Sequence, residues 1–261
     1  MIPGKSILLS LLLCILSIGY TAAQSSPRFD VYLLLGQSNM AGRGPLTEIS
    51  KAEFDARVYV FNRDSTWVPA KHPLHYDKPG VAAVGPGLAF GIEMAKAYPK
   101  VRIGLIPCAV GGTPIEHWIP GAYDAATKTH PYDDAVKRIS LAMAQGGVIK
   151  GVIWHQGEAN SGSEKVKVYL DQLKELIDRV RILAHNPKLP FVAGELGEFY
   201  KGHADFNANI QLLPKLVKGT AVVSAKGLTD KGDQVHFDAA SASELGKRYA
   251  EQILLLQKQL K

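Results

Sequence analysis

Short apolar runs alternate with longer segments of helical spacing along this sequence of 261 residues. The runs are almost continuously apolar, which is typical of strands buried on both faces of a sheet. Between them, apolar residues recur every three or four positions, which predicts amphipathic helices. We expect strands at residues 31–35, 58–61, 101–106, 148–154, 191–196 and 221–223. We expect helices at residues 87–98, 132–144, 162–185, 206–216 and 239–260.

The alternation of strands and helices predicts a fold class. Strands joined by helices form βαβ units, which build a parallel sheet with helices on both faces. We therefore expect an α/β protein, a three-layer α/β/α sandwich in one domain. Right-handed crossovers bring the carboxyl ends of such strands to one edge, where ligands bind. Ser38, Gly112 and residues 155–160 all follow strands, so we expect them at that edge.

Two local features predict how the chain runs between these elements. Residues 62–86 are rich in Pro, Gly and His, which predicts a long surface loop that could form a substrate wall. Ser161 is followed three residues later by Glu164, a spacing that resembles the capping box at the start of a helix.

The first residues predict a secretory signal peptide. Lys5 precedes an uncharged apolar stretch at residues 7–18, and Thr21-Ala22-Ala23 supplies the small residues of a cleavage site. The stretch is too short to cross a bilayer. We expect residues 1–23 to be removed, leaving a domain at residues 24–261. That domain would be periplasmic or extracellular and not held in a membrane.

The two cysteines and the charge balance argue against a lipid anchor, an internal disulfide and a nucleic-acid partner. Cys14 lies in the predicted signal peptide after Leu13, not after the small residue typical of a lipid-attachment site. Its removal leaves Cys108 alone, so we expect no internal disulfide and a buried thiol. The chain has 30 basic and 24 acidic residues, but the basic residues are spread out and no nucleic-acid motif is present. We expect no nucleic-acid partner.

Candidate catalytic residues lie at the end of the first strand and before the last helix. Ser38 follows the strand, but a serine is a weak nucleophile that needs a base, and the base needs an orienting group. Asp233 and His236 offer both in one loop. Their three-residue interval lets carboxylate and imidazole face each other, which leaves the other ring nitrogen for Ser38. The alternatives are a helix-capping serine and a solvated loop pair.

Acyl transfer also requires hydrogen-bond donors aimed at the developing oxyanion. The sequence offers three: the backbone N–H of Ser38, the backbone N–H of Gly112 and the side-chain amide of Gln156. Gly112 is a candidate because a residue without a side chain lets its N–H approach a ligand closely.

Four segments resemble successive blocks of the SGNH hydrolase superfamily. They are Gly36-Gln37-Ser38-Asn39-Met40-Ala41-Gly42-Arg43-Gly44, Gly111-Gly112-Thr113, Trp154-His155-Gln156-Gly157-Glu158 and Asp233-Gln234-Val235-His236-Phe237. Within the superfamily they are most similar to carbohydrate esterase family six and to sialate O-acetylesterase-like domains. The match covers essentially the whole chain after the signal peptide, in order.

The resemblance implies a three-layer fold, Ser38 as nucleophile, His236 as base and Asp233 as its orienter. It also implies an oxyanion hole formed by Ser38, Gly112 and Gln156. Gln156 replaces the Asn of the broader superfamily, which agrees with the narrower family. An α/β-hydrolase is less favoured because the Ser38 motif lacks the second glycine of G-x-S-x-G.

Other residues of these blocks have open roles. Glu158 could hold His236 or contact substrate, and Gln37 and Asn39 flank the nucleophile. His155 could bind sugar or pack inside the protein. We expect no metal, because a pair such as His72 and His75 lacks further ligands, and no cofactor is needed for the chemistry.

The residues predict an exported, metal-independent serine esterase, and the resemblance implies that its partner is an acetylated carbohydrate. Acetylated xylan is favoured over sialic acid because the resembling sialate enzymes are often longer, with added modules. Three alternatives stay open: a sialate O-acetylesterase, a carbohydrate-binding protein without activity on the same fold, and an esterase for lipid or small acyl esters. The intact Ser38, Asp233 and His236 argue against the binding protein.

Overall fold

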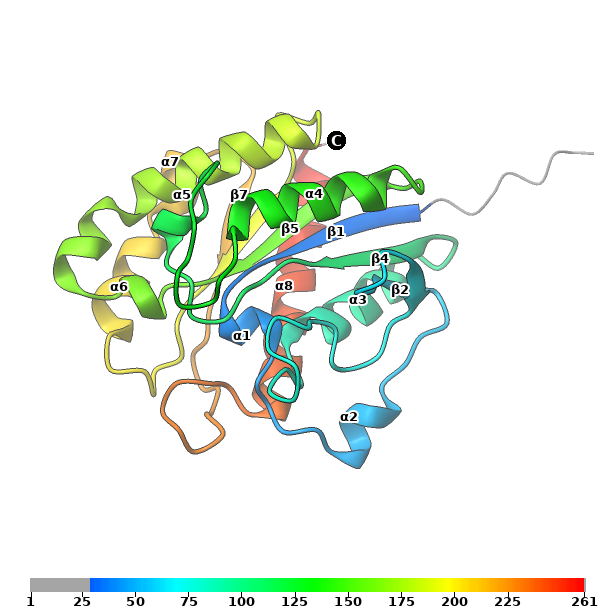
Figure 1. The fold of residues 1–261 in the computed structure, drawn as a ribbon, viewed down its shortest axis with the longest axis horizontal. Coiled ribbons are helices and arrows are strands. Elements are labelled where there is room, and N and C mark those ends of the chain that lie inside the picture. Colours follow the sequence, from blue (N-terminus) through cyan, green and yellow to red (C-terminus); the bar gives the residue numbers. More distant parts are fainter. Residues whose placement is uncertain (1–28, 261) are drawn as a thin grey trace, which may run out of the picture.

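Seven strands form one central sheet with helices on both faces (Figure 1). The structure is a computed structural model that describes residues 29–260. The predicted signal peptide, with Cys14, lies outside the described residues. The expected α/β fold with a central, mostly parallel sheet is confirmed.

The sheet is parallel except at one edge. Its spatial order is β3-β2-β4-β1-β5-β6-β7, and only β3 runs antiparallel to its neighbour β2. All six predicted strands are present, while β3 was not predicted. The bounds are β1 Phe29–Gly36, β2 Val58–Phe61, β3 Trp67–Pro69, β4 Arg102–Pro107, β5 Val148–His155, β6 Phe191–Gly194 and β7 Thr220–Val223.

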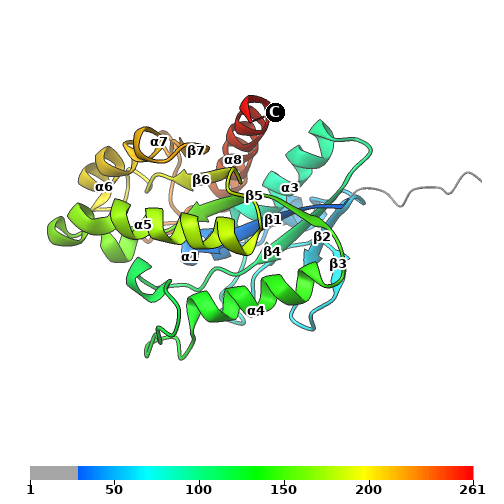
Figure 2. The same cartoon turned by 90° about the horizontal axis from the view of Figure 1, so that it is seen from above.

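The helices divide into two layers. Figure 2 shows α3 and α8 on one side of the sheet and α4 and α5 on the other. The α-helices are α1 Ser38–Ala41, α2 Glu48–Ala52, α3 Pro86–Ala97, α4 Pro131–Met143, α5 Ser163–Leu183, α6 His203–Ile210, α7 Leu213–Leu216 and α8 Ala239–Gln259. Two 3₁₀ turns, η1 Ile115–His117 and η2 Glu158–Asn160, lie in loops.

The central strand β1 explains why the sheet needs both layers. Its side chains alternate: Val31, Leu33 and Leu35 join the core beneath α4 and α5, whereas Tyr32 and Leu34 join the core beneath α3 and α8. All five are at most 1% exposed. A strand whose two faces are both apolar has to be covered on both sides, which favours the three-layer arrangement.

The predicted helix at residues 206–216 is two helices. It is interrupted between α6 and α7, because Pro214 has no N–H and its ring would clash with the carbonyl of Ile210 in a continuous helix. Pro214 instead lies in the first turn of α7, where proline is tolerated.

The predicted capping box at the start of α5 is wrong. The N-cap residue is Gly162, and no side chain caps the helix. Ser161 belongs to the preceding turn, where its hydroxyl donates to Glu158 O at 3.2 Å. Glu164 pairs with Lys167 on the helix surface. The spacing of the two residues was right for the motif, but Ser161 lies too far ahead of the helix.

The predicted surface loop at residues 62–86 is partly interior. It contains β3, and it buries Leu74 and His75, which are 6% and 4% exposed. Leu74 joins the apolar core beneath α3. The segment therefore folds inward, because its single leucine has core to pack against.

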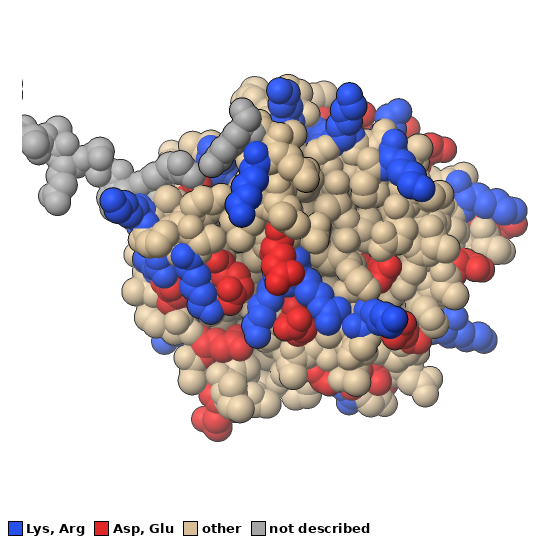
Figure 3. All heavy atoms as spheres, turned by 180° about the vertical axis from the view of Figure 1, so that it is seen from behind, with Lys and Arg blue, Asp and Glu red and all other residues tan. Residues whose placement is uncertain are grey.

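The described residues offer neither a membrane-spanning helix nor a cluster of metal ligands. Within residues 29–260, no helix combines the length and apolar character needed to cross a bilayer. The same residues contain no group of three or more His, Cys, Asp or Glu side chains arranged to hold a metal ion. On the face drawn in Figure 3, Lys and Arg are interspersed with Asp and Glu.

Leu245 of α8 is fully buried against the sheet, whereas Leu255 of the same helix is 48% exposed. We predict that Leu245→Ala lowers the free energy of unfolding by about 2–5 kcal/mol, because it removes buried methyl groups and leaves a cavity. Leu255→Ala is the matched control and should cost less than about 1 kcal/mol. Urea unfolding measures both values. Equal losses would contradict the placement of α8.

Candidate active site

Ser38 lies where β1 turns sharply into α1. Gly36 ends the strand with φ of +133°, and a Cβ there would lie 2.1 Å from His155 O, so only glycine fits this approach to β5. The next residue, Gln37, donates its N–H to the same carbonyl at 2.9 Å. Ser38 then opens α1 and is 8% exposed. The close contact between strands thus sets where the hydroxyl emerges.

The structure brings the three residues predicted as a triad together. His236 Nε2 lies 3.1 Å from Ser38 Oγ, and His236 Nδ1 lies 2.7 Å from Asp233 Oδ2. The other carboxylate oxygen of Asp233 accepts the backbone N–H groups of Val235 at 3.0 Å and His236 at 2.8 Å. A tight turn therefore fixes carboxylate and imidazole face to face, as the three-residue interval predicts.

The surroundings of Asp233 favour its ionised form. Partial burial on its own would raise the pKa of the carboxyl, but the hydrogen bonds from the His236 side chain and from two backbone N–H groups hold that pKa well below its usual range. Lys231 Nζ lies 3.3 Å from Asp233 Oδ2. At neutral pH the group is a carboxylate, which can accept a hydrogen bond from an N–H at His236 Nδ1.

Asn39 ties the loop that carries His236 to the helix that carries Ser38. Its Nδ2 donates to Val235 O at 2.9 Å, and its Oδ1 accepts the Phe237 N–H at 3.1 Å. These two bonds lie on either side of His236 in the sequence. One side chain next to Ser38 therefore positions the base.

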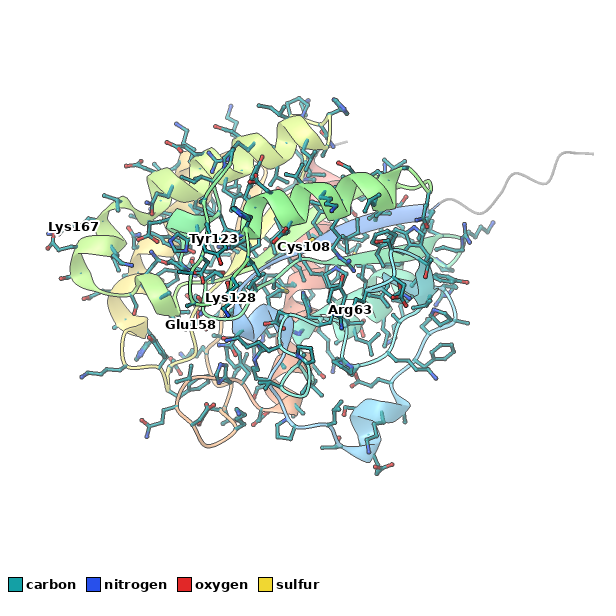
Figure 4. All side chains as sticks on the ribbon, viewed as in Figure 1. Arg63, Cys108, Tyr123, Lys128, Glu158 and Lys167 are labelled. Carbon is teal, nitrogen blue, oxygen red and sulfur yellow. The ribbon has the colours of Figure 1, made fainter. Side chains whose placement is uncertain are left out.

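Glu158 holds the two side chains on either side of Ser38. Its carboxylate accepts hydrogen bonds at 2.5 Å from Gln37 Nε2 and from Asn39 Nδ2, the two side chains flanking Ser38. Figure 4 shows Glu158 next to α1. Burial raises the pKa of Glu158. No hydrogen bond or ion pair joins Glu158 to His236 among residues 29–260, so Asp233 is the carboxylate that holds the ring.

The backbone N–H groups of Ser38 and Gly112 are available near the Ser38 hydroxyl. The glycine turn, Gly111 and Gly112, follows β4 and is held beside β1 by the hydrogen bond from Val110 N to Gly36 O at 3.0 Å. A Cβ on Gly111 would lie 3.4 Å from Ser38 Cβ, and Gly112 has φ of +93°. Within the described chain, neither Ser38 nor Gly112 uses its N–H in an intramolecular hydrogen bond.

The amide of Gln156 is largely engaged inside the protein. Its Nε2 donates to Asn160 Oδ1 at 2.6 Å, and Asn160 is itself oriented by the Ile115 N–H at 3.0 Å. The other contacts of Gln156 Nε2, with Gln37 Oε1 at 3.3 Å and Thr113 O at 3.4 Å, are long for hydrogen bonds. One N–H of Gln156 is therefore held firmly and the second weakly, and its part in an oxyanion hole stays a prediction.

His155 is packed inside the protein, so it does not contact substrate as one reading of the sequence suggested. It is 0% exposed, and its Nδ1 lies 3.0 Å from the Tyr249 hydroxyl. Its ring packs on Phe237 with 5.6 Å between centroids. Burial lowers the pKa of His155 to about 3, so the ring is neutral.

Sequence reasoning missed Asp77 and Asn160. Asp77 Oδ2 accepts the Gly111 N–H at 2.9 Å and pairs with Arg43 Nη2 at 2.6 Å. Nothing in the Pro-rich segment around Asp77 indicated that it turns inward. Asn160 lies two residues after Glu158, and this closeness to the Trp154–Glu158 block was the only signal in the sequence for its contact with Gln156.

Comparison with known proteins matches the chain to carbohydrate esterases. A family model described as "Carbohydrate esterase, sialic acid-specific acetylesterase" matches residues 28–255. A relative from Arabidopsis thaliana, a probable carbohydrate esterase, is 32% identical over 246 residues, which cover 87% of this chain and 91% of the relative.

Solved structures share the fold. The X-ray structure of the Arabidopsis thaliana protein superposes with a TM-score of 0.77 at 29% identity and covers 88% of this chain and 99% of that one. The structure of NanS gives a TM-score of 0.71 at 17% identity and covers 89% and 98%. A carbohydrate acetylesterase from Xanthomonas citri gives 0.63 at 21% identity, covering 85% of this chain and 55% of that one.

Fold and site together define an α/β protein that brings Ser38, His236 and Asp233 together at the carboxyl edge of its sheet. The chain belongs to the carbohydrate esterase, sialic acid-specific acetylesterase family. This membership makes it a carboxylic ester hydrolase.

Proposed function

We propose that this protein removes O-acetyl groups from carbohydrate through an acetyl-enzyme on Ser38. The observation that carries the proposal is the continuous chain from Ser38 Oγ through His236 to Asp233, at 3.1 and 2.7 Å. Beside it lie the N–H groups of Ser38 and Gly112, which have no hydrogen-bond partner within residues 29–260. Nucleophile, base, orienter and oxyanion donors are the parts that acyl transfer requires.

In the first step, Ser38 Oγ attacks the acetyl carbonyl carbon while His236 Nε2 takes the hydroxyl proton. The carbonyl oxygen becomes an oxyanion, which the N–H groups of Ser38 and Gly112 stabilise, with the weakly held N–H of Gln156 as a third donor. The intermediate collapses as the protonated His236 returns its proton to the leaving sugar oxygen. Asp233 stabilises the imidazolium throughout.

In the second step, water replaces the sugar. His236 takes a proton from the water as its oxygen attacks the acetyl carbon, and the same N–H groups stabilise the second oxyanion. The bond to Ser38 Oγ then breaks, the proton passes from His236 to that oxygen, and acetic acid leaves and ionises to acetate in water.

The proposed substrate is an O-acetylated sugar, with acetylated xylan as the polymer predicted from sequence. Tyr123, which is 51% exposed, lies on the loop that follows the glycine turn, and Figure 4 shows it with Lys128 on that loop. Its ring packs against His130 in a tilted arrangement, with 5.0 Å between the ring centroids. An exposed aromatic ring with a polar edge suits the apolar and hydroxyl faces of a sugar.

O-acetyl sialic acid is the second candidate, and Lys78 favours it. Lys78 Nζ lies 4.0 Å from the position of a Cβ on Gly112, and no acidic side chain pairs with it among the described residues. A cation at this place would attract the carboxylate that sialic acid carries and neutral xylan lacks. The family description points the same way.

We further propose that the protein is exported. This rests on the charge, apolar stretch and small residues of residues 1–23. Fusion of that segment to a reporter, with cell fractionation, tests it.

Asp233 is the carboxylate expected to orient His236. Asp233→Asn should lower kcat by about 10²–10⁴-fold, because the amide cannot hold His236 in the required tautomer and charge state. Glu158→Gln, which leaves the Asp233 contact intact, should cost less in kcat but lower the melting temperature, since its new N–H faces amide donors. Steady-state kinetics on a small acetyl ester measure both. A near-normal Asp233→Asn with an inactive Glu158→Gln would assign the orienter to Glu158.

The two substrate candidates differ in charge, which makes them separable by activity. Acetate release should be seen with acetylated xylan, with O-acetyl sialic acid or with both, and Ser38→Ala should abolish it. Lys78→Met should raise KM for O-acetyl sialic acid and leave that for acetylated xylan unchanged, because only the first has a carboxylate. Release from neither sugar, with sugar binding kept by Ser38→Ala, would favour a binding protein. A steep preference for long acyl chains would favour a lipid esterase.

A further inference from the structure

One carboxylate oxygen ties three separate segments together beside the nucleophile. Asp77 Oδ2 accepts the Gly111 N–H at 2.9 Å and the Arg43 Nη2 hydrogen bond at 2.6 Å. Arg43 also donates from Nη1 to Gly42 O at 2.7 Å. Arg43 follows α1, Asp77 lies between β3 and α3, and Gly111 follows β4. The position of the glycine turn relative to α1 therefore depends on Asp77.

The contact leaves no space for adjustment at Gly111. A Cβ there would lie 2.4 Å from Arg43 Nη2, 2.9 Å from Asp77 Oδ2 and 3.4 Å from Ser38 Cβ. The first two distances are shorter than real Cβ contacts, so a side chain at position 111 would displace the Arg43–Asp77 pair. The Arg43–Asp77 pair and the nucleophile thus lie against the same backbone unit.

The pair is buried and charged. The side chains of Arg43 and Asp77 are 3% and 2% exposed. Burial alone would raise the pKa of Asp77, but the hydrogen bond and charge of Arg43, with the Gly111 N–H, hold it below its usual range. Asp77 is therefore a carboxylate at neutral pH. A hydrogen bond from an N–H to a carboxylate is stronger than one to a neutral acceptor.

We infer that Asp77 is a positioning residue for the oxyanion hole. By holding the Gly111 N–H, it fixes the peptide that follows, whose N–H belongs to Gly112 and has no intramolecular partner among the described residues. A donor fixed before the reaction stabilises the oxyanion without reorganising. The inference rests on the proposed acyl transfer at Ser38.

The test compares substitutions of Asp77 in the full-length protein. Asp77→Ala should lower kcat by about 10–100-fold with KM changed less than about threefold, because a displaced donor weakens transition-state binding only. Asp77→Asn keeps an oxygen that can accept from both Gly111 and Arg43, and it should stay within about threefold of the wild-type kcat. The affinity for phenylboronic acid, which forms a tetrahedral adduct with a serine hydroxyl, should fall in proportion to kcat/KM.

The matched control is the pair of Asp55 and Arg57, which also meets at 2.6 Å but contacts Ala95 O, away from the nucleophile. Asp55→Ala should lower the melting temperature with kcat unchanged. Rates of the Asp55 and Asp77 variants are divided by the fraction of protein that a fluorophosphonate labels at completion, so misfolded protein does not count. If Asp77→Ala is too unstable to purify, Asp77→Ser replaces it, because its hydroxyl is too short to reach Gly111.

The outcomes separate this inference from the proposed function. If Ser38→Ala keeps the wild-type rate, the proposed function fails whatever Asp77 does. If Ser38→Ala is inactive and folded Asp77→Ala or Asp77→Ser keeps the wild-type kcat and boronic acid affinity, only the role of Asp77 is refuted. A loss of kcat in Asp77→Asn as large as in Asp77→Ala would also refute it.

Discussion

The hydrogen bonds of the Asn39 side chain hold the candidate active site together. Asn39 is adjacent to Ser38, and it bonds to the backbone on both sides of His236, 196 and 198 residues further along the chain. Ser38 and His236 come from opposite ends of the described chain, so nothing local keeps them 3.1 Å apart. The Asn39 amide links the two segments directly, and Glu158 orients that amide in turn.

The polar groups around Ser38 are buried, which makes their pairing important. Gln37, Asn39, Gln156 and Glu158 are each at most 9% exposed. Hydrogen bonds inside a protein are stronger than in water, and an unpaired buried polar group costs more. Glu158 accepts from two amides, which limits the rotations that Gln37 and Asn39 can adopt. The network therefore favours one arrangement of the nucleophile's neighbours before substrate binds.

The sequence predicted what depends on local pattern. Continuous apolar runs located six strands, because such runs fit only the interior of a covered sheet. The interval between Asp233 and His236 predicted their contact, because a short turn leaves few alternatives. What escaped prediction depends on distant contacts: Asp77 meets a residue 34 positions away, and the burial of His155 depends on Tyr249 from the last helix. Pro214 did carry a local signal for the break between α6 and α7.

The central claim is that Ser38 forms an acetyl-enzyme. The most direct measurement is rapid acid quenching of the protein mixed with a small activated acetyl ester, followed by mass spectrometry of the proteolytic peptides. We predict that the peptide containing Ser38 gains the mass of one acetyl group, that the label builds up within the first turnover, and that Ser38→Ala shows none. Acetate release at the full rate with no labelled peptide, or with the label on another residue, would contradict the mechanism.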